Sequence, residues 1–172
     1  MATIKHTSWV LGLVGLAAFA SATVFAGPST NRQVIERWMT IMDNKQLDQL
    51  AKVEASDLVF TSPMGNAKSS RAHAEILKGF ATAFPNFKHT VSRCVESGEM
   101  ISCEGRFIGD NTGPLMTPDG KTVPPTRKHV DAPWAAFATI KGQKVTTCNV
   151  YYDVMGLLGQ LGLGPAGPTA SK

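Results

Sequence analysis

Residues 128–153 have the sequence KHVDAPWAAFATIKGQKVTTCNVYYD. Two runs rich in β-branched and aromatic residues, 128–140 and 144–153, flank a Lys-Gly-Gln turn at 141–143. Alternating residues on both sides of a glycine-containing turn are typical of a β-hairpin. We therefore expect two long antiparallel strands at the end of the chain, and they decide what the rest of the sheet looks like.

More strands are predicted upstream of this hairpin. Apolar and polar residues alternate over 87–96 and again over 100–108, and Ser97-Gly98 separates the two runs. A shorter strand-like run covers 57–61 and stops before Pro63. The second half of the chain is thus mainly β, interrupted by a loop rich in Gly, Pro and Asp between Gly109 and Thr126.

Three helices are expected before the main strands. A capping box at Thr30, followed by apolar residues at helical spacing, predicts a helix over 31–43. A short second helix is expected at 47–53, and a third is capped by Ser69 or Ser70. Helices followed by strands indicate an α+β fold, with the three N-terminal helices on one face of a strongly curved, mainly antiparallel sheet.

A sheet curved over helices encloses a cone with one open mouth, which is a natural pocket for a small molecule. A short apolar helix at 155–161 closes the domain, which we place at 27–165, and residues 166–172 form a flexible tail. The composition agrees with one globular domain: the chain has 172 residues, 43% of them hydrophobic and 17% charged.

The charge and the motifs exclude several function classes. The formal charge of +4 is spread along the chain without a run of Lys or Arg, so nucleic acid is not expected as a partner. Spacings typical of zinc, nucleotide or dinucleotide sites do not occur, and the four His and three Cys are dispersed. We expect no metal and no cofactor.

Residues 1–26 resemble a secretory signal peptide. Lys5 precedes an apolar run from Trp9 to Ala20, and small residues at Val24 and Ala26 predict cleavage after Ala26. The run is shorter than the roughly 20 residues of a membrane span; an uncleaved N-terminal anchor remains the alternative. The mature protein is expected to be secreted or periplasmic and free of the membrane.

Export would permit disulfides, and three cysteines follow the signal segment. Cys94 and Cys103 flank the Ser97-Gly98 turn and could oppose each other in a hairpin. Strand alternation argues against this pair, because it places Cys94 on the polar face and Cys103 on the apolar face. We favour three small, partly buried thiols, Cys148 included.

Three motifs resemble the polyketide-cyclase branch (SnoaL-like, or ester cyclase) of the nuclear-transport-factor-2-like (NTF2-like) superfamily. Residues 153–162, DVMGLLGQLG, look like that family's closing D-x-x-G-L-L-x-Q-L-G. Residues 80–87, FATAFPNF, are similar to its F-x-x-x-F-P-D segment. Gly109 and Gly113 are spaced as in its G-x-x-x-G, with Pro-Pro-Thr at 124–126.

The resemblance implies an NTF2-like cone that holds a hydrophobic ligand, and ring closure by an aldol step without a metal. The acid/base aspartate of the cyclases falls at Val150, and its partner histidine at Ala136. Asn111 stands where the family often has His. Because Val and Ala cannot carry a proton, any proton transfer must use other residues.

Candidates for that role are few. His129 and Asp131 share a strand face and could form a base with its orienting acid, or a solvated pair on the outer face. Asp153 is either the N-cap of the last helix or a carboxylate at the rim; we favour the cap. His73 and His89 have no obvious partner and are interpreted as surface or core residues.

The apolar face of the long strand, with Trp134 as its best candidate, is expected to line the cone. The predicted ligand pocket comprises Trp134, Phe107, Asn111, Ala136, Cys148, Val150 and Phe80. Two hypotheses follow: an exported protein with cyclase or isomerase chemistry on a small hydrophobic or aromatic ligand, or a non-catalytic binding module or homodimeric scaffold of the same fold. An ionisable side chain inside the cavity would favour catalysis.

Overall fold

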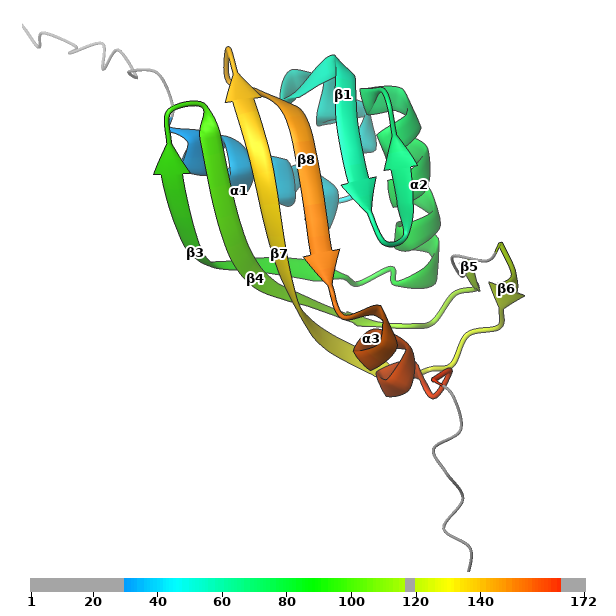
Figure 1. The fold of residues 1–172 in the computed structure, drawn as a ribbon. Coiled ribbons are helices and arrows are strands. Elements are labelled where there is room, and N and C mark those ends of the chain that lie inside the picture. Colours follow the sequence, from blue (N-terminus) through cyan, green and yellow to red (C-terminus); the bar gives the residue numbers. More distant parts are fainter. Residues whose placement is uncertain (1–29, 117–119, 165–172) are drawn as a thin grey trace, which may run out of the picture.

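The computed structural model describes residues 30–116 and 120–164. One six-stranded sheet has the order β2-β1-β8-β7-β4-β3 (Figure 1). Its strands are β1 (Glu54–Ser62), β2 (Gly65–Ala67), β3 (Lys88–Ser97), β4 (Met100–Asp110), β7 (His129–Lys141) and β8 (Lys144–Tyr152). Neighbouring strands are antiparallel except for β1 and β8, which run parallel. The α+β class, the curved sheet and the two central strands agree with the sequence prediction.

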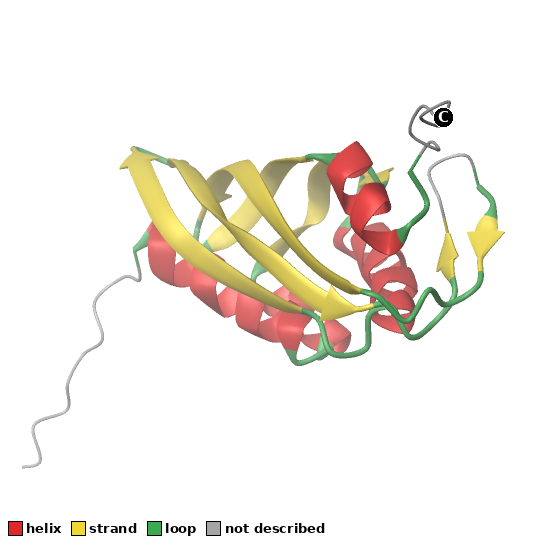
Figure 2. Ribbon diagram, turned by 90° about the horizontal axis from the view of Figure 1, so that it is seen from below, coloured by secondary structure: helices red, strands yellow, loops and turns green. Residues whose placement is uncertain are grey.

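The helices cover one face of the sheet (Figure 2). They are α1 (Asn31–Asp43), the 3-10 helix η1 (Leu47–Lys52) and α2 (Ser70–Ala83), whereas α3 (Val154–Leu161) lies at the end of the sheet against β7. The expected capping box of Thr30 and Gln33 begins α1, and Ser69 caps α2. The predicted second helix is a single 3-10 segment that leads directly into Glu54, the first residue of β1.

The loop after β4 carries a small two-stranded sheet, β5 (Leu115–Met116) with β6 (Thr122–Val123). The sequence predicts a loop without strands in this region. The loop begins tightly against the end of α2. A Cβ at Gly113 would overlap the Thr82 carbonyl oxygen. The second glycine of the G-x-x-x-G motif is therefore needed for close packing.

The prediction of unpaired thiols at Cys94 and Cys103 is wrong: the two residues form a disulfide, with their Cα atoms 4.1 Å apart. The β3–β4 register shifts between Val91 and Arg93, so that Ser92 is one extra residue on β3. Such a bulge reverses the facing of every later residue on the strand. Cys94 consequently pairs with Cys103 on the inner side of the sheet.

The predicted signal segment, 1–26, and the predicted tail, 166–172, lie outside the described residues. Among the helices that are described, none is long and apolar enough to cross a membrane. The core lies between α1, α2 and the inner sheet face, and its largest fully buried side chains include Trp38, Phe84, Phe87, Leu50 and Leu58.

Candidate functional site

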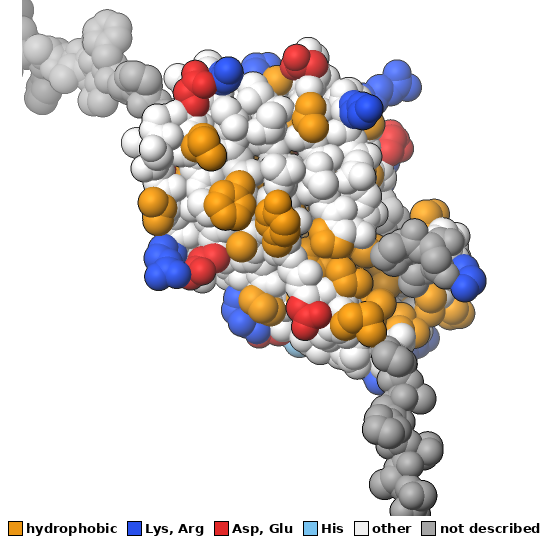
Figure 3. Space-filling model, viewed as in Figure 1, with side chains coloured by type: hydrophobic (Ala, Val, Ile, Leu, Met, Phe, Trp, Pro, Cys, Tyr) orange, Lys and Arg blue, Asp and Glu red, His pale blue; other side chains and the backbone are white. Residues whose placement is uncertain are grey.

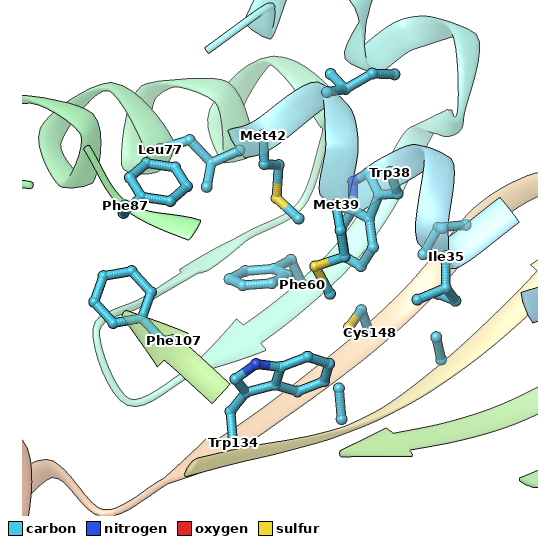
Figure 4. Close-up of a cluster of buried hydrophobic side chains, with 14 of the residues drawn as sticks. Ile35, Trp38, Met39, Met42, Phe60, Leu77, Phe87, Phe107, Trp134 and Cys148 are labelled. Carbon is cyan, nitrogen blue, oxygen red and sulfur yellow. The ribbon is translucent and has the colours of Figure 1, made fainter. Parts of the chain in front are cut away.

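A central cavity of about 120 Å³ lies between the helices and the inner face of the sheet. Figure 4 shows its neighbourhood: Trp38, Met39 and Met42 descend from α1, while Phe107 and Trp134 face them from the sheet. Most of the lining is apolar: Trp38, Met39, Met42, Phe60, Met64, Ile76, Leu77, Phe80, Phe87, Phe107, Ala132, Pro133, Trp134, Ala136, Val150 and Leu157. The remaining lining residues are Ser62, His73, His89, Cys148 and Tyr152.

Six of the seven residues predicted for the pocket line this cavity: Phe80, Phe107, Trp134, Ala136, Cys148 and Val150. The alternation of β7 explains the agreement, because its buried residues fall on every second position from Val130. Ala136 and Val150, which the sequence resemblance places at the acid/base positions of the cyclases, are paired directly across β7 and β8. That part of the wall therefore carries no proton donor or acceptor in its side chains.

Asn111 is the exception. Its side-chain amide donates to the carbonyl oxygens of Ala83 and Gly113, at 3.1 and 2.9 Å. Its side-chain oxygen accepts from the backbone N–H of Thr126 at 2.8 Å and from the Thr126 hydroxyl at 3.0 Å. A fully buried amide with both ends bonded ties the loop to α2. The prediction that Asn111 lines the pocket is therefore wrong.

A histidine–carboxylate pair that the sequence does not predict lies on the helix side of the cavity. His73, in the first turns of α2, has its Nδ1 atom 2.7 Å from Oε1 of Glu54, and both side chains are fully buried. The same Oε1 atom accepts the indole N–H of Trp38 at 2.7 Å. The interpretation that His73 has no partner is therefore wrong, and an ionisable pair lies at the cavity.

The contact with Glu54 determines which nitrogen of the His73 ring is left without a hydrogen-bond partner. An ionised Glu54 only accepts hydrogen bonds, and in that state Nδ1 of His73 carries the hydrogen that lies between the two side chains. The other nitrogen, Nε2, then has a lone pair in the neutral imidazole. It is buried and has no hydrogen-bond partner among the described residues. The ring of His73 lines the cavity, and its buried Nε2 atom is the one side-chain nitrogen of the ring without a partner among the described residues.

A second histidine–carboxylate pair lines the same cavity. Nδ1 of His89, on β3, lies 2.7 Å from Oδ1 of Asp43 at the end of α1. The Asp43 carboxylate also accepts the backbone N–H of His89 at 3.0 and 3.1 Å. The two side chains are 17% and 12% exposed, so this pair is closer to solvent than the Glu54–His73 pair.

The catalytic candidates from the sequence lie elsewhere. His129 is bonded to Asp110 at 2.7 Å, with 59% of its side chain exposed. Asp131 pairs with Arg106 on the outer sheet face rather than with His129. Asp153 caps α3 by accepting the N–H of Gly156 at 2.9 Å. The predicted cap by Asp153 is thus present, whereas His129 and Asp131 lie on the outer face but do not pair with each other.

The remaining titratable lining residues are neutral at ordinary pH. Burial raises the pKa of the Cys148 thiol to about 12, and the nearby Glu54 carboxylate adds to the shift. Burial alone raises the pKa of the Tyr152 phenol to about 12. Neither is a nucleophile near neutral pH. In the part of the chain that the structure describes, no three His, Cys, Asp or Glu side chains gather as metal ligands.

One sequence signal could have revealed His73. It stands four residues before Leu77 and seven before Phe80, so it lies on the apolar face of its helix. A histidine in that position needs a buried partner. No sequence pattern, however, identifies Glu54 as that partner, because the contact joins the start of β1 to another layer of the fold.

Comparisons with known proteins agree with the fold. A family model described as SnoaL-like polyketide cyclase matches residues 32–161. A search of curated proteins finds no match. Solved structures match over most of the chain, and at the identities given below they establish the fold alone.

Two of these solved structures come from Streptomyces. IdmH of Streptomyces antibioticus, a proposed polyketide cyclase, is 18% identical, with a TM-score of 0.67 over 78% of this chain and 99% of its own. TsrD of Streptomyces laurentii is 15% identical, with a TM-score of 0.67 over 77% of this chain and 94% of its own. A protein with a ketosteroid isomerase-like fold from Catenulispora acidiphila, solved with trimethylamine, is 15% identical, with a TM-score of 0.65 over 78% and 95%.

Proposed function

Because the chain belongs to the SnoaL-like polyketide cyclase family, we propose that it binds a small, mostly apolar molecule in the central cavity and moves a proton on it. The reaction is of the cyclase or isomerase type and uses no metal or cofactor. His73 is the general base, and Glu54 positions it. The proton-transferring residue thus lies on α2, on the helix side of the cavity. The sheet side, where the resemblance places the family's acid/base positions, has Ala136 and Val150 instead.

The observation that carries this proposal is the unpartnered Nε2 of His73. Keeping a histidine and a carboxylate in a protein interior costs free energy that a hydrophobic pair would not. Glu54 and Trp38 hold the imidazole in one orientation, as the third member of a catalytic triad does for its histidine. A carbon acid lying against Nε2 would lose its proton to this atom, and the electron pair would move onto the adjacent carbonyl.

An aldol closure also needs a proton for the new alkoxide. We assign this step to His89, which lines the same cavity and is held by Asp43 through both its ring and its backbone N–H. Its ring contacts those of Phe107 and Trp134, with centroids 5.5 and 6.3 Å apart. The two imidazoles thus supply a base and an acid on one cavity.

The test uses cyclohexanone as a minimal carbon acid. In D₂O, removal of an α-proton by His73 and return of a deuteron from the imidazolium exchange the α-hydrogens, which ¹H NMR records. General base catalysis contributes about 10²–10⁴-fold. We expect His73→Gln to slow the protein-dependent exchange by about 100-fold or more, since glutamine can still donate to Glu54 but cannot move a proton.

His129→Gln is the matched control. It removes a histidine of the same chemistry, also 2.7 Å from a carboxylate, on the outer surface. This variant should exchange cyclohexanone at the wild-type rate. Equal rates for wild-type and His73→Gln protein, with both folded, would contradict the assignment of His73 as the base.

The second candidate function is binding without chemistry, which the loss of ionisable residues at Ala136 and Val150 favours. In this case the cavity serves a carrier, and cyclohexanone binds without exchanging its α-hydrogens. The same NMR samples distinguish the two functions, because binding shifts the ligand resonances whereas exchange removes their intensity.

We propose that the protein is exported after cleavage behind Ala26, to the periplasm or the medium. The Cys94–Cys103 disulfide supports this, because disulfides persist in oxidising compartments and are rare in the cytosol. The mass of the protein recovered from its own compartment tests it: a chain that begins at Gly27 supports export, and an uncut chain in the cytosol contradicts it.

We also propose a homodimer formed through the outer face of the sheet. Figure 3 shows hydrophobic side chains on this face. Val59, Phe137 and Tyr151, on the neighbouring strands β1, β7 and β8, are 49%, 49% and 57% exposed. Sedimentation should show a dimer for the wild type and a monomer for Phe137→Glu; a monomeric wild type would refute the proposal.

A further inference from the structure

The sheet wall of the central cavity holds two hydrogen-bond donors without acceptors. The indole Nε1 of Trp134 and the hydroxyl of Tyr152 are both buried, and neither has a partner within the described residues. Both residues line the cavity. Leaving a buried polar group unpaired costs about 1–3 kcal/mol, so two of them in one small cavity call for an explanation.

The two residues that carry these donors lie next to each other because of the strand register. Trp134 on β7 is the direct cross-strand partner of Tyr152 on β8, and such partners have Cβ atoms about 5 Å apart on the same face. In Figure 4 the indole nitrogen of Trp134 lies on the side of the ring that faces the cavity. Trp134 itself is only 6% exposed.

We propose that Trp134 and Tyr152 form a paired-donor site that binds the carbonyl oxygen of the ligand and stabilises the enolate formed when His73 removes the neighbouring proton. This rests on the proposed function and names its substrate class: a small ketone, or a related carbonyl compound, with an acidic C–H beside the carbonyl. The tryptophan N–H and the tyrosine O–H each donate one hydrogen bond to the same oxygen.

Several properties of the wall agree with this assignment. The indole N–H of Trp134 can only donate, so its hydrogen-bond partner must be an acceptor such as a carbonyl oxygen. Burial keeps Tyr152 protonated, and a neutral phenol is the donor form. Preorganised donors aimed at an oxygen that gains charge are the usual way in which proteins stabilise an oxyanion. His73 lines the same cavity from α2, in the opposite layer of the fold.

The cavity volume limits the size of the substrate. An apolar protein cavity of about 150 Å³ binds benzene, and the central cavity is about 120 Å³. The part of the ligand enclosed here is therefore about one ring in size. Ile76, Phe80 and Met64 in the lining are only half-buried, so a larger molecule would extend past them towards solvent.

The test compares two probes of equal shape. Cyclohexanone and methylenecyclohexane differ in having C=O or C=CH₂, so the ratio of their dissociation constants isolates the hydrogen bonds to oxygen. Tyr152→Phe should weaken cyclohexanone binding about tenfold relative to methylenecyclohexane, since a lost hydrogen bond with an unpaired group costs about 1–3 kcal/mol. Trp134→Phe should change the same ratio in the same direction.

Tyr151→Phe is the matched control, because it removes the same hydroxyl from the neighbouring residue on the outer face. It should leave the ratio unchanged. If Tyr152→Phe and Trp134→Phe both keep the wild-type ratio, the paired-donor site is refuted, whatever the exchange rate is. Conversely, a ratio that responds while His73→Gln exchanges normally would retain the donor site and refute the base. Using a ratio removes any general effect of the substitutions on cavity shape.

Discussion

Trp38 and Trp134 offer a paired test of how the site is held. Both indoles are buried, at 1% and 6% exposure. Only Trp38 has a partner, since its N–H donates to Glu54 at 2.7 Å whereas Nε1 of Trp134 is unpaired among the described residues. Replacement of either residue with Phe deletes the same atoms, so the terms for lost contacts and residual void largely cancel.

The difference between the two variants therefore reports the hydrogen bond. A bond to a charged group contributes about 1.5–3 kcal/mol, whereas removal of an unpaired donor relieves about 1–3 kcal/mol. Allowing for water in the cavity, we expect Trp38→Phe to lower the free energy of unfolding by about 2–4 kcal/mol more than Trp134→Phe does. For a domain of this size, this is a difference in Tm of several degrees.

Urea denaturation followed by far-ultraviolet circular dichroism is the assay, because tryptophan fluorescence would be altered by the substitutions themselves. The disulfide is kept oxidised, and the m-values should agree between the variants, which shows that the denatured states are comparable. If the two variants are equally stable, or if Trp134→Phe is the less stable one, then Glu54 does not accept the Trp38 N–H and the account of how His73 is oriented is wrong.

Three further predictions concern stability, each measured by urea denaturation. The disulfide closes a short loop with a sequence separation of 9, so replacing both Cys94 and Cys103 with Ala should lower the free energy of unfolding by about 2–3 kcal/mol. Reductant should destabilise the wild type and leave this variant unchanged. An equal effect of reductant on both proteins would contradict the disulfide. Burial raises the pKa of Cys148 from 9.0 to about 12 and that of Tyr152 from 10.0 to about 12. The unfolded state therefore loses these protons at lower pH than the folded state, and the free energy of unfolding should fall from about pH 9 towards pH 12. Cys148→Ala should lessen that fall, and an unchanged dependence of the free energy of unfolding on pH would argue against a buried thiol. A Cβ at Gly79 of α2 would meet no atom within 4 Å, whereas one at Gly105 would overlap the Thr90 carbonyl. Gly79→Ala should therefore stabilise the protein by about 0.5–1 kcal/mol, and Gly105→Ala should destabilise it. A Gly105→Ala variant more stable than Gly79→Ala would be inconsistent with this packing.

Local patterns were enough to predict most of the fold. The capping box at Thr30, the two strands around the 141–143 turn and the cap by Asp153 depend on neighbouring residues, and the structure has all three. The inward face of β7 also followed from alternation alone. Five of the six predicted residues that line the cavity belong to strands, where a period of two fixes the facing.

Errors occurred where one extra residue or a distant partner decides the outcome. The bulge at Ser92 reversed the facing of Cys94, and nothing in the alternation of β3 announces it. His73 and Glu54 are 19 residues apart, on different layers. Their contact depends on how α2 packs over β1, which periodicity does not encode. The sequence therefore predicted most of the residues that line the cavity but not the contact between His73 and Glu54.

The most direct test of the central claim is ¹⁵N NMR of the His73 ring, assigned with the His73→Gln variant, at pH 8 with and without cyclohexanone. The account predicts a hydrogen on Nδ1, bonded to Glu54, and an unprotonated Nε2 whose resonance moves when the ketone binds. A hydrogen on Nε2, or a resonance that is indifferent to the ketone, would contradict the claim that this cavity presents a basic nitrogen to its ligand.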